Sequence, residues 1–140
     1  MKFPYEKIEV IPCPAFPQGY ATLRPIIPVT FEYRGEQRRY RALVDSGADF
    51  CIFHSLVGEL LGLDVDQGKE ARFSGVGASS MRAYFHTVTA HIGEHSYQLY
   101  CGFSRDIPAD GYGILGQAGF FDHFKVTLDH QQEEVEIIAK

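Results

Sequence analysis

The chain has 140 residues, of which 45% are hydrophobic and 22% charged, as in an ordinary globular protein of one compact domain. This composition excludes a disordered tail, a collagen-like fibre and a coiled coil. The net charge of −5 gives no general attraction to nucleic acid or to an anionic membrane, so we expect partners of neither kind.

The N-terminal part of the chain is rich in proline. Five prolines fall within the first 25 residues, and proline disfavours both helix interiors and central strands. We therefore predict a Pro-rich N-terminal extension over residues 1–25, lying in an extended or edge conformation, and a folded domain over residues 26–140. Within that domain, residues 26–33 and 37–44 read as two strands joined by a turn at Arg34-Gly35-Glu36.

Short strands dominate the rest of the pattern. Further strands are predicted over residues 50–53, 71–74, 81–92, 97–103, 125–128 and 134–138. A short helix is expected from a cap at Ser55 to Leu61, with Gly62 ending it, and a second helical turn is expected around Phe120, Phe121 and Phe124. The predicted fold is all-β in the main, a small closed β-barrel or sandwich with one or two short helices.

The cysteines indicate a reducing compartment. Cys13, Cys51 and Cys101 are odd in number and far apart, so they cannot form a closed disulfide framework. Neither a signal-peptide pattern nor a stretch of about 20 apolar residues is visible, and we expect a cytoplasmic protein. Cys51 and His54 are three residues apart along a strand and point to opposite faces, so a buried structural cysteine is favoured over a thiol nucleophile.

Three other patterns have simple structural interpretations. Gly111 to Gly116 matches the dinucleotide fingerprint GxGxxG, but only 24 residues follow it, too few for a doubly wound sheet. His91 and His95 have the spacing of a helical metal pair, but Gly93 between them indicates a hairpin turn. The arginines of residues 34–41, interleaved with Tyr33 and Tyr40, are interpreted as a solvated hairpin.

Two sequence elements together indicate a catalytic site. In Leu43-Val44-Asp45-Ser46-Gly47-Ala48, an apolar strand runs into a carboxylate, a hydroxyl and two small residues. A carboxylate at the end of a buried strand is costly unless a site uses it, although a simple turn would place the same residues there. A second element follows about seventy residues later, the apolar-apolar-Gly pattern of Ile114-Leu115-Gly116.

Together these two elements resemble the retropepsin-like aspartic proteases. In that family Asp-Thr/Ser-Gly-Ala holds the catalytic aspartate, and a later apolar-apolar-Gly strand braces the loop. Residues 73–80 form a Gly-rich hairpin tip where the family places the flap that closes over substrate. The resemblance spans about residues 28–129 and includes the stretch from Gly119 to Val126, which is similar to the family's short helix and following strand.

The resemblance implies a set of roles and a partner. Asp45, Ser46 and Gly47 would be catalytic, and Ala48, Asp49, Gly75, Val76, Gly77 and Ile114 would bind substrate. Because the Asp-Ser/Thr-Gly signature occurs once, the resemblance implies a homodimer with one Asp45 from each subunit. It implies a protein or peptide substrate and neither a metal nor a cofactor.

The implied chemistry is direct hydrolysis by water. Two facing carboxylates share one proton, so one can draw a proton from water while the other donates to the peptide carbonyl. An acid-leaning activity optimum is expected. The family often has an arginine after the apolar-apolar-Gly element, which pairs with the aspartate matching Asp49; here the residue is Gln117, which can offer only a neutral hydrogen bond.

Two other functions stay open at this point. The same fold could serve as a dimeric module that binds a peptide or small ligand without cutting it, in which case Asp45 would matter for shape alone. A generic small-ligand β-barrel would make Asp45 an incidental turn residue. For residues 1–25, a pro-segment, a dimer strand and a disordered arm are all compatible with the pattern.

Overall fold

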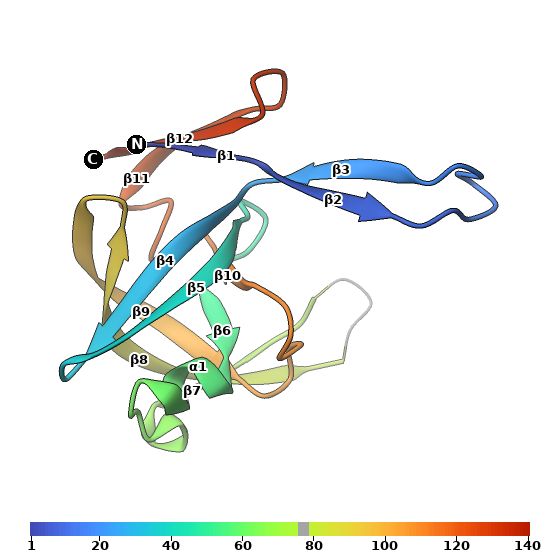
Figure 1. Ribbon diagram of the computed structural model, residues 1–140. Coiled ribbons are helices and arrows are strands. Elements are labelled where there is room, and N and C mark those ends of the chain that lie inside the picture. The colour runs from blue at the N-terminus through green and yellow to red at the C-terminus, as the bar shows by residue number, and fades with distance from the viewer. Residues whose placement is uncertain (76–78) are drawn as a thin grey trace.

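The computed structural model describes residues 1–75 and 79–140, and it is built almost entirely from strands (Figure 1). In chain order the elements are β1 (Lys2–Pro4), β2 (Glu6–Val10), β3 (Tyr20–Arg24), β4 (Ile26–Tyr33), β5 (Glu36–Val44), β6 (Ile52–His54), α1 (Ser55–Leu60), the 3-10 helix η1 (Val65–Gln67), β7 (Lys69–Phe73), β8 (Met81–Ile92), β9 (His95–Ser104), β10 (Gly113–Leu115), β11 (Phe124–Asp129) and β12 (Glu134–Ala139). No described helix has the length and apolar character needed to cross a membrane. The mostly β class predicted from the sequence is confirmed.

Six strands close into a ring. Their order is β4-β5-β10-β6-β9-β8, and a further pairing of β4 with β8 joins the two ends, while β7 lies outside β8. Alternate residues of these strands point inward, as the period of two predicts. Ile27, Val29 and Phe31 of β4 are completely buried in the ring, and Leu99, Cys101 and Phe103 of β9 face them from the other side. The core therefore fills the ring.

Strand β10 gives the ring its particular topology. It runs parallel to β5, with Ile114 opposite Leu43, and antiparallel to β6, with Ile114 also opposite Ile52. β5 and β6 are consecutive strands, so β10 is inserted between two neighbours in the sequence. Gly113 begins it because a Cβ there would lie inside the ring of Phe53. As a result, β5 and β6 do not pair with each other, because β10 lies between them.

The helical predictions were correct in part. Helix α1 ends as expected, since Gly62 has a φ of +87° just past its last turn. The cap is His54 rather than Ser55, because the His54 Nδ1 accepts from the Leu56 N–H at 3.1 Å and Ser55 is buried as the first helical residue. Around Phe120 there is no regular helix, but the Phe124 N–H donates to the Phe120 carbonyl at 3.0 Å, so a single hydrogen-bonded turn stands where the second helical turn was predicted. Gly119, just before this turn, has a φ of +100°.

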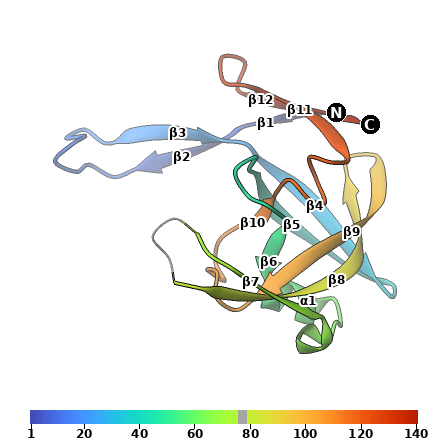
Figure 2. The ribbon, with the colours of Figure 1, turned by 180° about the vertical axis from the view of Figure 1, so that it is seen from behind.

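Residues 1–25 divide into two parts. Strand β1 pairs with β12, the last strand of the chain, and β12 pairs with β11, so a three-stranded sheet holds both termini together (Figure 2). Strands β2 and β3 form a separate two-stranded hairpin that leaves the ring. The prolines at 12, 14 and 17 all fall in the connection between these two strands. The domain division at residue 25 stays a prediction.

Candidate active site

The loop that carries Asp45 is fixed by β10 and the residues after it. The loop joins β5 to β6, and its first N–H, that of Asp45, donates to the Leu115 carbonyl at 3.0 Å. Past the end of β10, the Gln117 N–H donates to the Ala48 carbonyl at 2.8 Å and the Ala118 N–H donates to the Asp49 carbonyl at 2.9 Å. Backbone hydrogen bonds therefore hold the loop at both ends, as the apolar-apolar-Gly element was predicted to do.

The interior of the loop is a tight turn built on Asp45 itself. The Gly47 N–H donates to Oδ1 of Asp45 at 2.9 Å, and the Ala48 N–H donates to the Asp45 carbonyl at 3.2 Å. The Asp45 side chain is half-buried, whereas Ser46 and Gly47 are exposed. One carboxylate oxygen is thus held by the backbone in a fixed orientation, which is the preorganisation that a reacting carboxylate needs.

Close packing beneath the loop explains the glycine at position 116. A Cβ there would collide with the Phe50 carbonyl oxygen and lie 2.8 Å from that of Ala48. The Gly116 N–H points instead at Sγ of Cys51, 3.4 Å away. Burial raises the pKa of Cys51 to about 12, so its thiol stays protonated near neutrality. Cys51 is therefore a structural residue behind the loop, as the sequence favoured.

A cavity of about 340 Å³ opens beside Asp45. It is lined by Asp45, Gly47, Ala48, Asp49, Phe50, Ile52, Phe73, Ser74, Gly75, Met81, Ile107 and Ile114. Its size is that of a small ligand site, and apart from the two aspartates its side chains are mostly apolar. The arrangement can hold an apolar side chain of an extended peptide next to a carboxylate.

Most of the site residues predicted from the sequence line this cavity. Asp45, Gly47, Ala48, Asp49, Gly75 and Ile114 all do so. Ser46 belongs to the same loop but lies outside the cavity lining, and its carbonyl accepts from Nε2 of Gln117 at 2.8 Å. Val76 and Gly77 fall outside the described residues. Gln117 thus makes a neutral hydrogen bond within the loop, where the family often has an arginine.

Five apolar residues that the sequence did not assign to the site also line the cavity: Phe50, Ile52, Phe73, Met81 and Ile107. Phe73 and Met81 are paired across the end of the β7–β8 hairpin, and Ile107 comes from the connection between β9 and β10. The Phe50 ring stands edge-on to that of Phe73, with centroids 5.6 Å apart. Phe50 follows the Asp45 motif directly and could have been included on that ground. Ile52 follows close by in β6, and the other three reach the cavity through contacts that are distant in the sequence.

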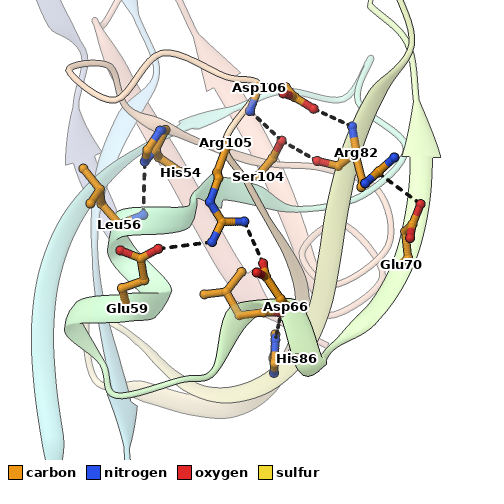
Figure 3. A network of polar contacts seen from close by, with 11 residues as sticks. His54, Leu56, Glu59, Asp66, Glu70, Arg82, His86, Ser104, Arg105 and Asp106 are labelled. Atoms are coloured by element: carbon orange, nitrogen blue, oxygen red, sulfur yellow. Dashed lines mark hydrogen bonds and ion pairs between the residues drawn. The ribbon is translucent and has the colours of Figure 1, made fainter.

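A polar network fixes the hairpin and the 104–107 connection to each other (Figure 3). The buried Ser104 hydroxyl donates to the Arg82 carbonyl at 2.6 Å and accepts from the Asp106 N–H at 3.0 Å. The Arg82 N–H donates to Oδ2 of Asp106 at 2.8 Å. These bonds close a cycle between β8 and the residues just before Ile107. The base of the hairpin that lines the cavity is therefore anchored.

Comparisons with known proteins give a family from one search and a fold from another. A family model described as aspartyl protease matches residues 27–118, from β4 to just past Gln117. No curated protein sequence gives a match. Among solved structures, a retropepsin-like aspartic protease from Rickettsia conorii is similar with a TM-score of 0.59 and 15% identity, over 95% of this chain and 98% of that one. This likeness shows a shared fold.

Two further solved structures are more distantly similar. The retroviral protease-like domain of Ddi1 from Leishmania major matches at 18% identity over 82% of this chain and 94% of that one, with a TM-score of 0.49. EIAV protease, complexed with the inhibitor HBY-793, matches at 20% identity over 67% and 82%, with a TM-score of 0.47. Because the family model spans well over half of the sequence and includes the braced Asp45 loop, the chain belongs to the aspartyl protease family and has a retropepsin-like fold.

Proposed function

We propose that this protein is an aspartic endopeptidase that acts as a homodimer on extended peptide segments. The observation that carries the proposal is the Asp45 carboxylate, oriented by the Gly47 N–H and placed at the edge of an apolar cavity. Membership of the aspartyl protease family supports the same reaction. Asp45 takes the catalytic role, and Ser46 and Gly47 shape its loop.

The need for a second copy follows from the chemistry. Water activated by one carboxylate attacks the peptide carbonyl while a second, protonated carboxyl donates to the carbonyl oxygen. The Asp-Ser/Thr-Gly signature occurs once in the chain, so the second carboxyl is Asp45 of another copy. The two carboxyls share one proton, and the reaction passes directly to the hydrolysed product without an acyl-enzyme.

The cavity lining indicates the substrate class. Phe50, Phe73, Met81 and Ile114 offer apolar surface to a side chain next to the cleaved bond, and burial of such a side chain contributes about 2 kcal/mol. Ala48, Asp49 and Gly75 also line the cavity, and in this proposal they contact the extended backbone of the substrate. The predicted contacts of Val76 and Gly77 belong to this proposal as well. We expect cleavage beside large apolar residues.

The test compares the native chain with Asp45→Asn on a peptide library between about pH 4 and 7, where the carboxyl pair holds one proton. Asp64→Asn is the matched control, because Asp64 is exposed and its side chain makes no capping hydrogen bond. Asp45→Asn should reduce turnover by about 10³-fold or more, with Asp64→Asn unchanged. Turnover that survives Asp45→Asn would contradict the proposal. A native dimer that never cuts would point to a peptide-binding module.

A further inference from the structure

The hairpin of β2 and β3 forms an arm that the proposed reaction does not use. The arm, residues 6–24, is a two-stranded sheet of its own and projects from the ring in both ribbon views (Figures 1 and 2). None of residues 1–25 is buried, and the core begins at Ile26. An isolated two-stranded hairpin is at best marginally stable in water. The arm therefore lacks the packing that would stabilise it.

One face of the arm is apolar toward the tip, while the charged Glu6–Arg24 pair lies on the same face at the base. Val10 pairs with Tyr20 and Ile8 with Thr22, and cross-strand partners lie on the same face of a two-stranded sheet. The charged side chains of Lys7 and Glu9 alternate with them and lie on the opposite face. The outer part of the first face therefore has the apolar pattern of a sheet face that packs against another surface.

The end of the arm is the most exposed apolar part of the described chain. Ile11 is 82% exposed, Phe16 51% and Tyr20 43%, and the rings of Phe16 and Tyr20 lie 4.7 Å apart. Residues 10–23 contain no charged side chain. Exposed apolar patches of this kind mark interaction surfaces, and the lack of positive charge disfavours an acidic partner such as nucleic acid or an anionic bilayer.

The base of the arm lies next to the Asp45 loop. Pro25, which joins the arm to β4, accepts through its carbonyl from the Val44 N–H at 2.9 Å, one residue before Asp45. Ion pairing of Arg41 with Glu6 and a hydrogen bond from Arg24 to Tyr112 tie the arm to the ring. The arm and the β7–β8 hairpin project on the same side of the molecule (Figures 1 and 2). A second copy that brings its Asp45 to this loop would approach the base of the arm.

We propose that the arm packs its apolar face and tip against a second copy of this chain and stabilises the dimer on which the proposed proteolysis depends. Twofold symmetry makes the contact reciprocal, so each copy covers the arm of the other. This proposal rests on the proposed function for the choice of partner. It adds a surface outside the cavity that controls whether the two aspartates meet.

The first experiment measures the dimer dissociation constant by sedimentation equilibrium. Ile11→Ser with Phe16→Ser is compared with Leu56→Ser with Leu60→Ser, which removes two side chains of α1 that are 49% and 53% exposed. Both pairs replace two exposed apolar side chains by serine, so the ring should fold in each. The arm pair should weaken dimerisation at least tenfold, and the α1 pair should stay within twofold of the native chain.

The second experiment locates the arm in the dimer. Cys13 is the exposed cysteine near the arm tip, and Cys51 and Cys101 are buried, so a maleimide photocrosslinker attaches at Cys13 in the native chain. A mixture of ¹⁵N-labelled and unlabelled copies distinguishes crosslinks between copies from those within one. In an equal mixture at complete exchange, about half of the crosslinked peptides should carry both isotopes, as random pairing of copies requires. Crosslinks confined to one copy would overturn the proposal.

The remaining outcomes separate the arm from the reaction. An arm variant that dimerises within twofold of the native chain overturns the arm proposal, whatever its activity. So does a native chain that stays monomeric at every concentration, or that binds phosphatidylcholine–phosphatidylserine vesicles through the arm as a monomer. A native dimer that depends on the arm but cuts nothing supports the arm proposal and contradicts the proposed proteolysis.

Discussion

Gly116 lies where β10 leaves the ring beneath the Asp45 loop, and it leaves no room for a methyl group between the carbonyls of Phe50 and Ala48. We predict that Gly116→Ala lowers the free energy of unfolding by about 3 kcal/mol, since neither neighbour is a flexible side chain that can move aside. Urea denaturation measures this loss of unfolding free energy. Gly111→Ala is the control, because a Cβ there meets nothing closer than 3.7 Å. Equal losses for both variants would contradict this packing argument.

The three thiols differ in reactivity for the same local reasons. Burial raises the pKa of Cys51 to about 12 and also raises that of Cys101, so both thiols are protonated and shielded at pH 8. A disulfide reagent at this pH should titrate one thiol per folded chain and three per unfolded chain. Cys13→Ser should leave the folded chain unreactive. Rapid reaction of two or more thiols in the folded chain would show that the region behind the loop opens.

At the scale of elements, the Ser104 hydroxyl links β8 to the segment that follows β9. Ser104→Ala leaves the Arg82 carbonyl and the Asp106 N–H without their hydroxyl partner, at a cost of about 2 kcal/mol. Hydrogen exchange should become faster at the ends of β7 and β8 next to the cavity. Ser96→Ala serves as the control, since Ser96 is an exposed residue of β9 whose hydroxyl bonds to His91. Unchanged exchange in Ser104→Ala would show that the hairpin is held by strand pairing alone.

The elements also show how much of the fold could be predicted from the sequence. Alternating apolar residues predicted the ring strands from β4 to β9 because each strand has one buried face, and the Asp45 motif identified the loop. Three-residue β10 is too short to show a period, so its place between β5 and β6 could come only from the resemblance. The two strands of the arm were not predicted. Several prolines lie in the connection between β2 and β3, and they led to the prediction of an extended segment over all 25 residues.

The cavity likewise combines residues that are close in the sequence with residues that only the fold brings together. Asp45, Ala48 and Asp49 share one loop, and their proximity follows from the sequence itself. Ile107 and Met81 reach the cavity through strand pairing and the Ser104 network, and a single sequence carries no signal for such contacts. The apolar character of the site, and with it the expected substrate class, therefore required the structure.

At the scale of the whole molecule, the proposed site exists only between two copies. Mixing equal amounts of native chain and Asp45→Asn at constant total concentration should leave about one quarter of the native activity, because only dimers with two aspartates turn over. Activity is measured after subunit exchange is complete. Asp64→Asn in place of Asp45→Asn should leave the rate unchanged. A residual activity of one half would show that a single copy carries a complete site.

The insertion of β10 between β5 and β6 also sets an order of events during synthesis. The loop that carries Asp45 is made early, but its brace is encoded about seventy residues later, as the pairing of Ala42 with Gly113 shows. Contacts so distant in sequence form slowly and only after the later segment has left the ribosome. A nascent chain thus carries its carboxylate on an unbraced loop until residues 113–118 have also been translated and have left the ribosome. The topology itself delays the assembly of the site until this later segment is available.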